Sequence, residues 1–264
     1  VLNVPERIAH DRNASRPERN FGPHVVRQQM QQLHRSLRNL EREGFRHVYA
    51  LRTPEEIDAV TIERQPLWNN LKHEQGPFDI IGDVHGCFDE MVELLGKLGY
   101  SVDAETFKVT PPTGHKLVFV GDLLDRGPKI PRVLKLVMNA VADTAALCVP
   151  GNHDVKLMKK LRGRDVQITH GLADSLAQLE GETEEFRTQV AEFIDDLVSH
   201  YLLDGGRLVV AHAGMKESMQ GRGSGAVCDF ALFGETTGET DEFGLPIRYN
   251  WAAEYRGQAI VVYG

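Results

Sequence analysis

The stretch FDIIGDVHG, residues 78–86, decides the fold class. FDII is a short apolar run with few charges, which is typical of a strand buried on both faces of a sheet. Gly82 and Gly86 flank the polar part of the stretch, and glycines allow a sharp turn and leave room for a ligand. In an extended segment, side chains two residues apart point the same way. The stretch therefore predicts a buried strand that delivers Asp83 and His85 to one site.

Four further apolar runs, each long enough for a short buried strand, follow along the chain. They are KLVFV (116–120), ALCV (146–149), RLVV (207–210) and AIVVY (259–263). Helical patterns lie between the strands and cover residues 89–98, 129–141, 154–162 and 184–202. The alternation predicts an α/β fold with a parallel or mixed sheet, in which a ligand site lies beyond the carboxyl ends of the strands.

Polar motifs come directly after three of these four strands. They are G-D-L-L-D-R-G-P (121–128), P-G-N-H-D (150–154) and A-H-A-G (211–214). Together with the first stretch they supply the candidate site residues Asp83, His85, Asp122, Asp125, Arg126, Asn152, His153 and His212. Alone, G-D-L-L-D-R-G-P or G-N-H-D is also compatible with a turn that starts a helix, with Asp or Asn as the N-cap. The ordered set, each member following a strand, favours one metal site instead.

The donor types indicate which metals and which chemistry the site supports. The two carboxylate oxygens of Asp122 can bridge two cations, while Asn152 offers an amide oxygen and His212 an imidazole nitrogen. Mixed oxygen and nitrogen ligands without thiolates suit Mn²⁺, Fe, Ni²⁺ or Zn²⁺ better than Ca²⁺. Two such ions about 3.5–4 Å apart can hold a phosphate oxygen and activate water for in-line attack. We therefore expect a phosphoester hydrolase.

The motifs GDVHG, GDLLDRGP, GNHD and VVAHAG together resemble the calcineurin-like metallophosphoesterase superfamily, in the branch with protein Ser/Thr phosphatases and diadenosine tetraphosphatases. This resemblance implies two packed mixed β-sheets flanked by helices, with the metal site at the C-terminal ends of strands. PFDIIGDVHGC (77–87) and GNHDVKLMKKLRGR (151–164) look most like the central phosphatase module of bacterial polynucleotide kinase-phosphatase, an RNA-repair enzyme. The expected function is then removal of 2′-phosphate and 2′,3′-cyclic phosphate from RNA 3′ ends.

The same resemblance implies a dinuclear centre, with Mn²⁺ as the expected metal and Ni²⁺, Fe or Zn²⁺ as alternatives. The first ion would be held by Asp83, His85 and Asp122. The second ion would be held by Asp122, Asn152 and His212.

Three further residues receive roles from the resemblance. Arg126 would bind the substrate phosphate, for which a bidentate guanidinium is suited. His153 would donate a proton to the leaving oxygen, oriented by the carboxylate of Asp125. The alternatives are a structural ion pair of Arg126 with Asp122 or Asp125, and a loop role for His153 in which it bonds to backbone.

Other functions stay open from the sequence. A diadenosine tetraphosphatase shares the GNHD motif, whereas a protein Ser/Thr phosphatase usually carries Glu where Asp154 stands. A non-catalytic RNA-binding fragment is the contrasting class. The final AIVVYG (259–264) adds a last alternative, because in the resembled family such a strand ends in Gly-His and that His is a metal ligand. We therefore expect a chain truncated at its C-terminus, with low activity without the His expected after Gly264.

The N-terminal part differs from the rest in charge. Residues 1–76 carry a net charge of +2 (12 Lys and Arg against 10 Asp and Glu), and residues 77–264 a net charge of −10 (18 against 28). The segment 12–37 resembles the end of a kinase module, whose lid would include Arg12, Arg16 and Arg19, although no phosphate-binding G-x-x-x-x-G-K-[ST] loop is present. We expect residues 1–76 to be a kinase remnant plus linker, and residues 77–264 to be the metallophosphoesterase domain.

Local patterns in residues 1–76 predict three elements. Apolar residues at helical spacing from Val26 to Leu40 predict a helix that ends near Gly44. RHVYALR (46–52) is typical of a strand, and Thr53 with Glu56 is typical of a helix N-terminus. By contrast, GRGSGAVCDFALFGETTGETDEFGLP (221–246) is expected to form surface loops around the site.

The remaining expectations concern partners and location. No apolar run reaches the length of a membrane span and no basic-then-apolar leader opens the chain, which favours a cytoplasmic protein. The three cysteines are not spaced as metal ligands, which favours free buried thiols. The expected partners are RNA 3′ ends or nucleotide phosphates as substrate, and the kinase and ligase modules of a longer parent chain. His115, His170 and His200 lie outside the motifs, so we expect surface or packing roles for them.

Overall fold

The chain divides into two compact units, Val1–Gln65 and Pro66–Gly264. The computed structural model describes residues 1–19, 21–40, 47–63, 65–169, 171–242 and 246–264. The division falls before Pro66 rather than at the expected position after Gly76, because the intervening segment packs on the second unit. There the N–H of Leu71 donates to the carbonyl of Leu202 at 3.0 Å. A kinase origin for residues 1–76 stays a prediction.

The first unit consists of short helices. They are α1 (Glu6–Ala14), a 3₁₀ turn (Pro17–Arg19), α2 (Pro23–Leu37) and α3 (Pro54–Ala59). Thr53 is the N-cap of α3, as predicted, and its hydroxyl accepts the N–H of Glu56 at 3.2 Å. The helix expected to reach Leu40 ends at Leu37, and Gly44 lies outside the described residues. Residues 47–52 form no strand but only an isolated bridge between Leu51 and Leu2, so the predicted strand is wrong over its described part.

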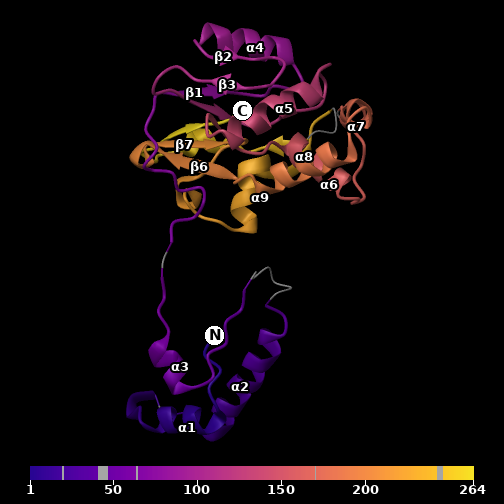
Figure 1. The fold of residues 1–264 in the computed structure, drawn as a ribbon. Helices are drawn as coiled ribbons and strands as arrows, with labels where there is room; N and C mark the ends of the chain where they lie inside the picture. The colour runs from indigo at the N-terminus through magenta and orange to yellow at the C-terminus, as the bar shows by residue number, and fades with distance from the viewer. Residues whose placement is uncertain (20, 41–46, 64, 170, 243–245) are drawn as a thin grey trace. The chain divides into compact units, whose positions relative to one another are not determined.

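The second unit contains two three-stranded sheets (Figure 1). The first is parallel throughout, in the order β1 (Phe78–Ile81), β4 (Lys116–Phe119) and β5 (Ala146–Cys148). The second is mixed, in the order β10 (Ile260–Val262), β7 (Leu208–Ala211) and β6 (His200–Leu203), with β6 antiparallel to β7. All five strands expected from the apolar runs are present, and the expected α/β fold of packed sheets flanked by helices is confirmed. Of these two sheets only the second is mixed over the described strands.

Alternation along the strands explains why the two sheets pack together. Val118 of β4 lies in a buried cluster with Tyr201 and Val210 of the second sheet. Its neighbours Leu117 and Phe119 point to the opposite face and join the helical core. Each sheet therefore buries one face against the other sheet and one face under helices, which accounts for the nearly continuous apolar strands.

The helices cover the outer faces of the two sheets. The first sheet is covered by α4 (Phe88–Lys97), α5 (Ile130–Ala142), α6 (Asn152–Leu161), α7 (Leu172–Glu180) and α8 (Glu184–Asp196). The outer face of the second sheet is covered by α9 (Gly225–Phe233), whose Val227 and Ala231 pack in one cluster with Val209. The other elements described in this unit are small. Two of them are 3₁₀ turns (Asp204–Gly206 and Glu217–Met219), and one is the short α10 (Trp251–Glu254). The rest are two-stranded ladders, of β2 (Ser101–Val102) with β3 (Val109–Thr110) and of β8 (Thr236–Thr240) with β9 (Pro246–Arg248).

Two predictions about the second unit are wrong. The helix expected over 184–202 ends at Asp196, because the four residues from His200 to Leu203 are all buried as β6 in the second sheet. Residues 221–246 are not only loops, since the apolar run GAVCDFALF forms α9 and residues 236–240 and 246–248 form β8 and β9. Residues 243–245 lie outside the described residues. Among the helices that the structure does describe, none has the length and apolar character needed to cross a bilayer.

The three cysteines are all free, as expected, but they differ in exposure. Cys148 is buried and Cys87 half-buried, whereas Cys228 on α9 is exposed, so the expectation of buried thiols is wrong for that residue. The reason is that α9 turns only one face to the second sheet.

Candidate metal centre

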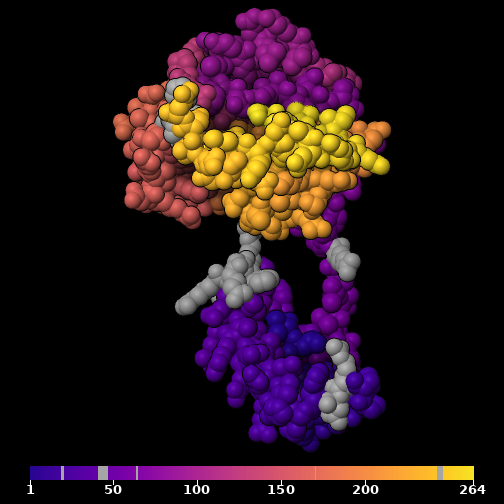
Figure 2. Space-filling view, turned by 180° about the vertical axis from the view of Figure 1, so that it is seen from behind, coloured from indigo at the N-terminus to yellow at the C-terminus, as the bar shows by residue number. Residues whose placement is uncertain are grey.

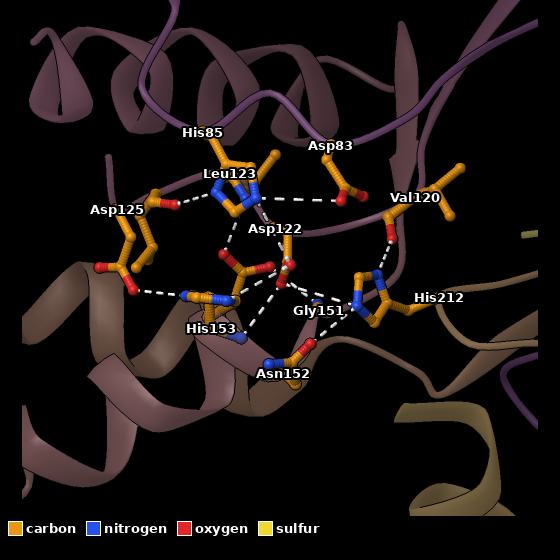
Figure 3. Close-up of polar contacts among 12 residues, drawn as sticks. Asp83, His85, Val120, Asp122, Leu123, Asp125, Gly151, Asn152, His153 and His212 are labelled. Carbon is orange, nitrogen blue, oxygen red and sulfur yellow. Dashed lines mark hydrogen bonds and ion pairs between the residues drawn. The ribbon is translucent and has the colours of Figure 1, made fainter. Parts of the chain in front are cut away.

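The ends of four strands bring the polar motifs together (Figure 3). Because β1, β4 and β5 are parallel, their carboxyl ends meet at one edge of the first sheet. The end of β7 in the packed second sheet adds His212. The structure thereby places one cluster from these four segments, made of Asp83, His85, Asp122, Asp125, Asn152, His153 and His212.

Asp122 lies at the centre of this cluster and only 4% of it is exposed. One carboxylate oxygen, Oδ1, accepts the backbone N–H of His153 at 3.1 Å and lies 3.7 Å from Nε2 of His212. The other oxygen, Oδ2, lies 3.8 Å from Nε2 of His85 and 3.9 Å from Nε2 of His153. The two oxygens therefore face different groups of ligand atoms, which is the arrangement that a bridging carboxylate requires.

Backbone hydrogen bonds fix the direction of both ligand imidazoles. Nδ1 of His85 donates to the carbonyl of Leu124 at 2.7 Å, and Nδ1 of His212 donates to the carbonyl of Val120 at 2.9 Å. Since carbonyls only accept, each Nδ1 carries the proton and each Nε2 presents a lone pair to the cluster. This is the outer contact by which proteins orient metal-binding histidines.

The cluster also leaves acceptor atoms facing one another. Nε2 of His85 is buried and has no hydrogen-bond partner among the described residues. Nε2 of His212 faces Oδ1 of Asn152 at 3.0 Å, so two lone-pair atoms share a space that suits a cation. A buried atom without a partner is costly in a folded protein, and a bound ion removes that cost.

The distances fit a divalent ion. Ligand atoms of Asp83, Asp122 and His212 all lie within 4.8 Å of one another. Ligands held about 2.0–2.2 Å from one ion are themselves roughly 3–4 Å apart, and the separations of 3.7 and 3.8 Å around Asp122 fall in that range. The oxygen and nitrogen donors agree with Mn²⁺, Fe, Ni²⁺ or Zn²⁺ rather than Ca²⁺.

His153 lies beside the metal cluster and is bound to a buried carboxylate. Its Nδ1 lies 2.5 Å from Oδ2 of Asp125, and Asp125 has no exposed surface. The hydrogen bond to Asp125 raises the pKa of His153, and the negative charge of Asp122 adds to this, while burial opposes it. The remaining oxygen of Asp125 accepts the hydroxyl of Ser175 on α7. Asp125 is therefore fixed on both sides, which holds the imidazole of His153 in place.

Ser175 and Asp154 are site residues that the sequence did not reveal as such. Ser175 belongs to no motif and lies on a helix that the apolar pattern did not predict. Asp154 is buried, and its carboxylate accepts the N–H groups of Gly151 at 2.8 Å and Leu123 at 3.0 Å. It therefore ties the loop after β4 to the loop after β5. Burial, with the nearby charge of Asp122, raises the pKa of Asp154 to about 7.

Arg126 is exposed and lies outside the buried cluster. Although Asp122 and Asp125 are described, neither forms an ion pair with Arg126, so the structural alternative for this residue is not seen. Its positive charge opposes the rise in the pKa of His153 and thus acts near the cluster. Arg126 remains available to an anionic ligand.

The residues outside the motifs have structural contacts. Nδ1 of His115 bonds to Asp79 at 2.8 Å, and Nε2 of His200 accepts the N–H of Gly221 at 2.9 Å, which are the packing roles expected. His170 lies outside the described residues. Arg12 and Arg16 line a cavity inside the first unit, and the side chain of Arg19 lies outside the described residues.

Comparison with known proteins agrees with the motifs. Residues 76–262 match the model of the calcineurin-like phosphoesterase family. The chain is 43% identical over 191 residues to the bis(5′-nucleosyl)-tetraphosphatase PrpE (asymmetrical) of Anoxybacillus flavithermus, covering 71% of this chain and 77% of the relative. The Bacillus subtilis protein of the same name is 44% identical over 191 residues, covering 71% and 78%. The crystal structure of "a putative diadenosine tetraphosphatase" matches with a TM-score of 0.50 and 28% identity, covering 74% of this chain and 77% of that one.

These relatives correct the finer interpretation of the sequence. They are named tetraphosphatases and not polynucleotide kinase-phosphatases, so removal of phosphates from RNA ends, the function predicted from the resemblance, is wrong. The error arose because the motifs at the metal centre are shared across branches that differ in substrate, and they report the chemistry rather than the substrate. The family model matches residues 76–262, which make up most of the chain. The chain therefore belongs to the calcineurin-like phosphoesterase family and is a hydrolase that acts on phosphate esters.

Proposed function

We propose that this protein is an asymmetrical bis(5′-nucleosyl)-tetraphosphatase. The observation that carries the proposal is the identity of 43–44% with relatives of that name over 191 residues. The cluster around Asp122 supplies carboxylate, amide and imidazole donors for divalent ions, which is what cleavage of a polyphosphate requires.

The word asymmetrical defines the products. In the substrate, four phosphates join two nucleosides. Hydrolysis of an outer phosphoanhydride bond adds the hydroxyl of water to one phosphorus and its proton to the oxygen that leaves. The products are one nucleoside triphosphate and one nucleoside monophosphate, whereas cleavage at the centre would give two diphosphates.

The proposed metal ligands fall into two sets that share one carboxylate. Asp83, His85 and Asp122 would hold the first ion, and Asp122, Asn152 and His212 the second. When bound, such ions polarise a phosphate oxygen and lower the pKa of water. Asp122 serves both sets because its two oxygens face Nε2 of His85 and Nε2 of His212, respectively. Mn²⁺ is the ion that we propose, since it accepts this mixture of donors.

His153 is the proposed proton donor for the leaving oxygen. Its Nδ1 is bound to Asp125, so its Nε2 is the atom directed to the substrate. The raised pKa keeps more of the imidazole protonated near neutral pH, which is the form that a general acid needs. Asp125 orients the ring, and the exposed Arg126 binds a phosphate oxygen through its planar guanidinium.

The proposed substrates are free dinucleotides, which points to a cytoplasmic location. The three free cysteines are consistent with a reducing compartment.

A panel of substrates tests this proposal. The protein loaded with MnCl₂ is incubated with P¹,P⁴-di(adenosine-5′) tetraphosphate, adenosine 2′,3′-cyclic phosphate and a phosphoserine peptide, and the products are separated by chromatography. We expect the dinucleotide to be cleaved with the highest kcat/KM. The Asp122→Ala variant should lose this activity by at least about 100-fold, since the shared ligand of both ions is removed. Preferential cleavage of the cyclic phosphate or the peptide would contradict the proposal.

A further inference from the structure

A cavity of about 860 Å³ lies in the second unit beside α10. It is lined by three aromatic and five charged residues, namely Tyr249, Trp251, Tyr255, Lys216, Glu217, Glu235, Glu254 and Arg256. Its volume is within the range of about 300–1,000 Å³ that small-molecule sites occupy. Figure 2 shows that the C-terminal segments, in yellow, spread over an exposed face of the second unit. The metal centre and the proposed chemistry leave this cavity without a role.

A second, smaller cavity of about 150 Å³ adjoins the first. The two cavities share Glu235, Tyr249, Asn250 and Trp251. The smaller one is also lined by Gly264, whose N–H donates to the carbonyl of His212 at 2.8 Å. A Cβ atom on Gly264 would lie only 2.7 Å from a carboxylate oxygen of Asp83. Gly264 therefore lies between the smaller cavity and two of the proposed metal ligands, Asp83 and His212.

The walls of the larger cavity offer flat aromatic surfaces. The ring of Trp251 lies 5.2 Å from that of Tyr263 and 6.0 Å from those of Tyr255 and Phe230. Its indole N–H donates to the carbonyl of Ala213 at 3.2 Å, which fixes the ring. Tyr249 is 54% exposed, and its ring contacts no other aromatic ring among the residues that are described. An aromatic ring in this position can stack on a purine or pyrimidine base.

Two of the charged groups, Arg248 and Glu254, are placed in a way that suits a nucleotide. Arg248 lines the smaller cavity, next to the metal centre, and is exposed without an ion pair to any described carboxylate. Lys216, in the larger cavity, is already paired with Glu235 at 2.5 Å. Glu254 lines the larger cavity and is exposed. A cation near the metal centre suits phosphates, and a carboxylate farther from it can accept ribose hydroxyls or a base amino group.

We infer that the larger cavity binds one nucleoside of the dinucleoside tetraphosphate, with its base against Tyr249, while Arg248 and the smaller cavity hold the phosphates that lead to the metal centre. This inference rests on the proposed function and deepens it. It assigns a role to the β8–β9 ladder and α10, which carry none of the catalytic motifs. It also explains how an enzyme of this family, whose metal centre recognises only phosphate, prefers a substrate with a second nucleoside.

The kinetic test compares three variants on two substrates. Tyr249→Ala removes the stacking surface and Tyr249→Phe keeps it. Ile247→Ala is the matched control, since Ile247 lies on β9, two residues before Tyr249, and is 39% exposed but lines neither cavity. We expect Tyr249→Ala to raise KM for P¹,P⁴-di(adenosine-5′) tetraphosphate about tenfold, in line with the loss of one stacked base. Its kcat/KM for p-nitrophenyl phosphate, which has no nucleoside, should stay unchanged, and Tyr249→Phe and Ile247→Ala should behave as the parent protein.

A binding measurement gives a second readout that does not depend on turnover. The chain has two tryptophans, so Trp68→Phe leaves Trp251 as the only one, and His153→Gln in the same protein slows hydrolysis. Trp251 emission should change when the dinucleotide is added in MnCl₂. When the Tyr249→Ala substitution is introduced into this protein, the apparent Kd for the dinucleotide should rise about tenfold. Tripolyphosphate, which lacks nucleosides, should leave the emission nearly unchanged.

The outcomes separate this inference from the proposed function. If the parent protein cleaves the dinucleotide but Tyr249→Ala matches Ile247→Ala in KM and in Kd, the nucleoside site is wrong and the proposed function stands. An equal change of Trp251 emission with tripolyphosphate would likewise overturn the nucleoside site. If the parent protein does not cleave the dinucleotide, the proposed function fails, and the inference fails with it.

Discussion

Gly151→Ala is the substitution whose effect on the metal centre follows most directly from the structure. A Cβ atom at this position would lie 2.0 Å from Oδ1 of Asp122 and 2.2 Å from its backbone nitrogen. Ordinary van der Waals contact begins at 3.4 Å, so either the carboxylate or the loop after β5 must move by more than about 1 Å. A displacement of that size in a catalytic group costs about 100-fold in rate. We therefore expect kcat/KM to fall about 100-fold and Mn²⁺ affinity, measured by calorimetry, to fall with it.

Gly82→Ala is the matched control for this prediction. Gly82 also directly precedes a proposed metal ligand, Asp83, but a Cβ atom there would have no heavy atom within 4 Å. The variant should keep Mn²⁺ affinity and kcat/KM within about threefold of the parent protein, because no neighbour has to move. Circular dichroism and thermal melting would show that both variants are folded. If folded Gly151→Ala binds Mn²⁺ as tightly as Gly82→Ala, the close packing inferred around Asp122 is wrong.

Three further predictions concern residues that support the cluster. Asp154→Ala removes the acceptor of two buried N–H groups, so the free energy of unfolding in urea should fall by about 2–4 kcal/mol; a loss under about 0.5 kcal/mol would show that these bonds contribute little. Burial lowers the pKa of His200 in the folded protein from 6.5 to about 4, so between these pH values the unfolded chain binds a proton that the folded protein does not. The stability that is present above pH 6.5 should therefore be lost as the pH falls to about 4. His200→Gln should flatten this dependence, and a variant that loses stability in parallel with the parent protein would refute it. Asp125→Asn removes the main cause of the raised pKa of His153, so the alkaline limb of the rate profile should move to lower pH; an unmoved limb would exclude His153 as the proton donor.

The strands and the clustering of polar side chains around Asp122 could be predicted from the sequence because both leave local signals. Buried strands such as Lys116–Phe119 are short apolar runs, and each ligand motif directly follows one of them. Parallel pairing then brings Asp83, Asp122 and Asn152 to one edge without any further information.

Other parts of the fold depend on contacts between distant segments. The four residues of β6 resemble the end of the preceding helix in apolar content, and only pairing with β7 makes them a strand. Ser175 reaches Asp125 across 50 positions of sequence, so no local spacing could reveal it.

The substrate could not be predicted because the motifs of the proposed metal centre concern only the phosphate. The motifs around Asp122 are compatible with several phosphate esters, and selection among them needs contacts with the rest of the substrate. In this chain those contacts would come from residues such as Tyr249 and Arg248, in a segment that carries no catalytic motif. A pattern of loops, turns and single aromatic residues gave no signal for a nucleoside site.

The products of P¹,P⁴-di(adenosine-5′) tetraphosphate cleavage test the central claim most directly. The protein with MnCl₂ is allowed to convert a small fraction of the substrate, and the adenosine mono-, di- and triphosphates are quantified by chromatography. Asymmetrical hydrolysis predicts equal amounts of the mono- and triphosphate from the earliest time point, with no diphosphate, and no products in EDTA. Two molecules of diphosphate per substrate, or no cleavage with MnCl₂ present, would contradict it.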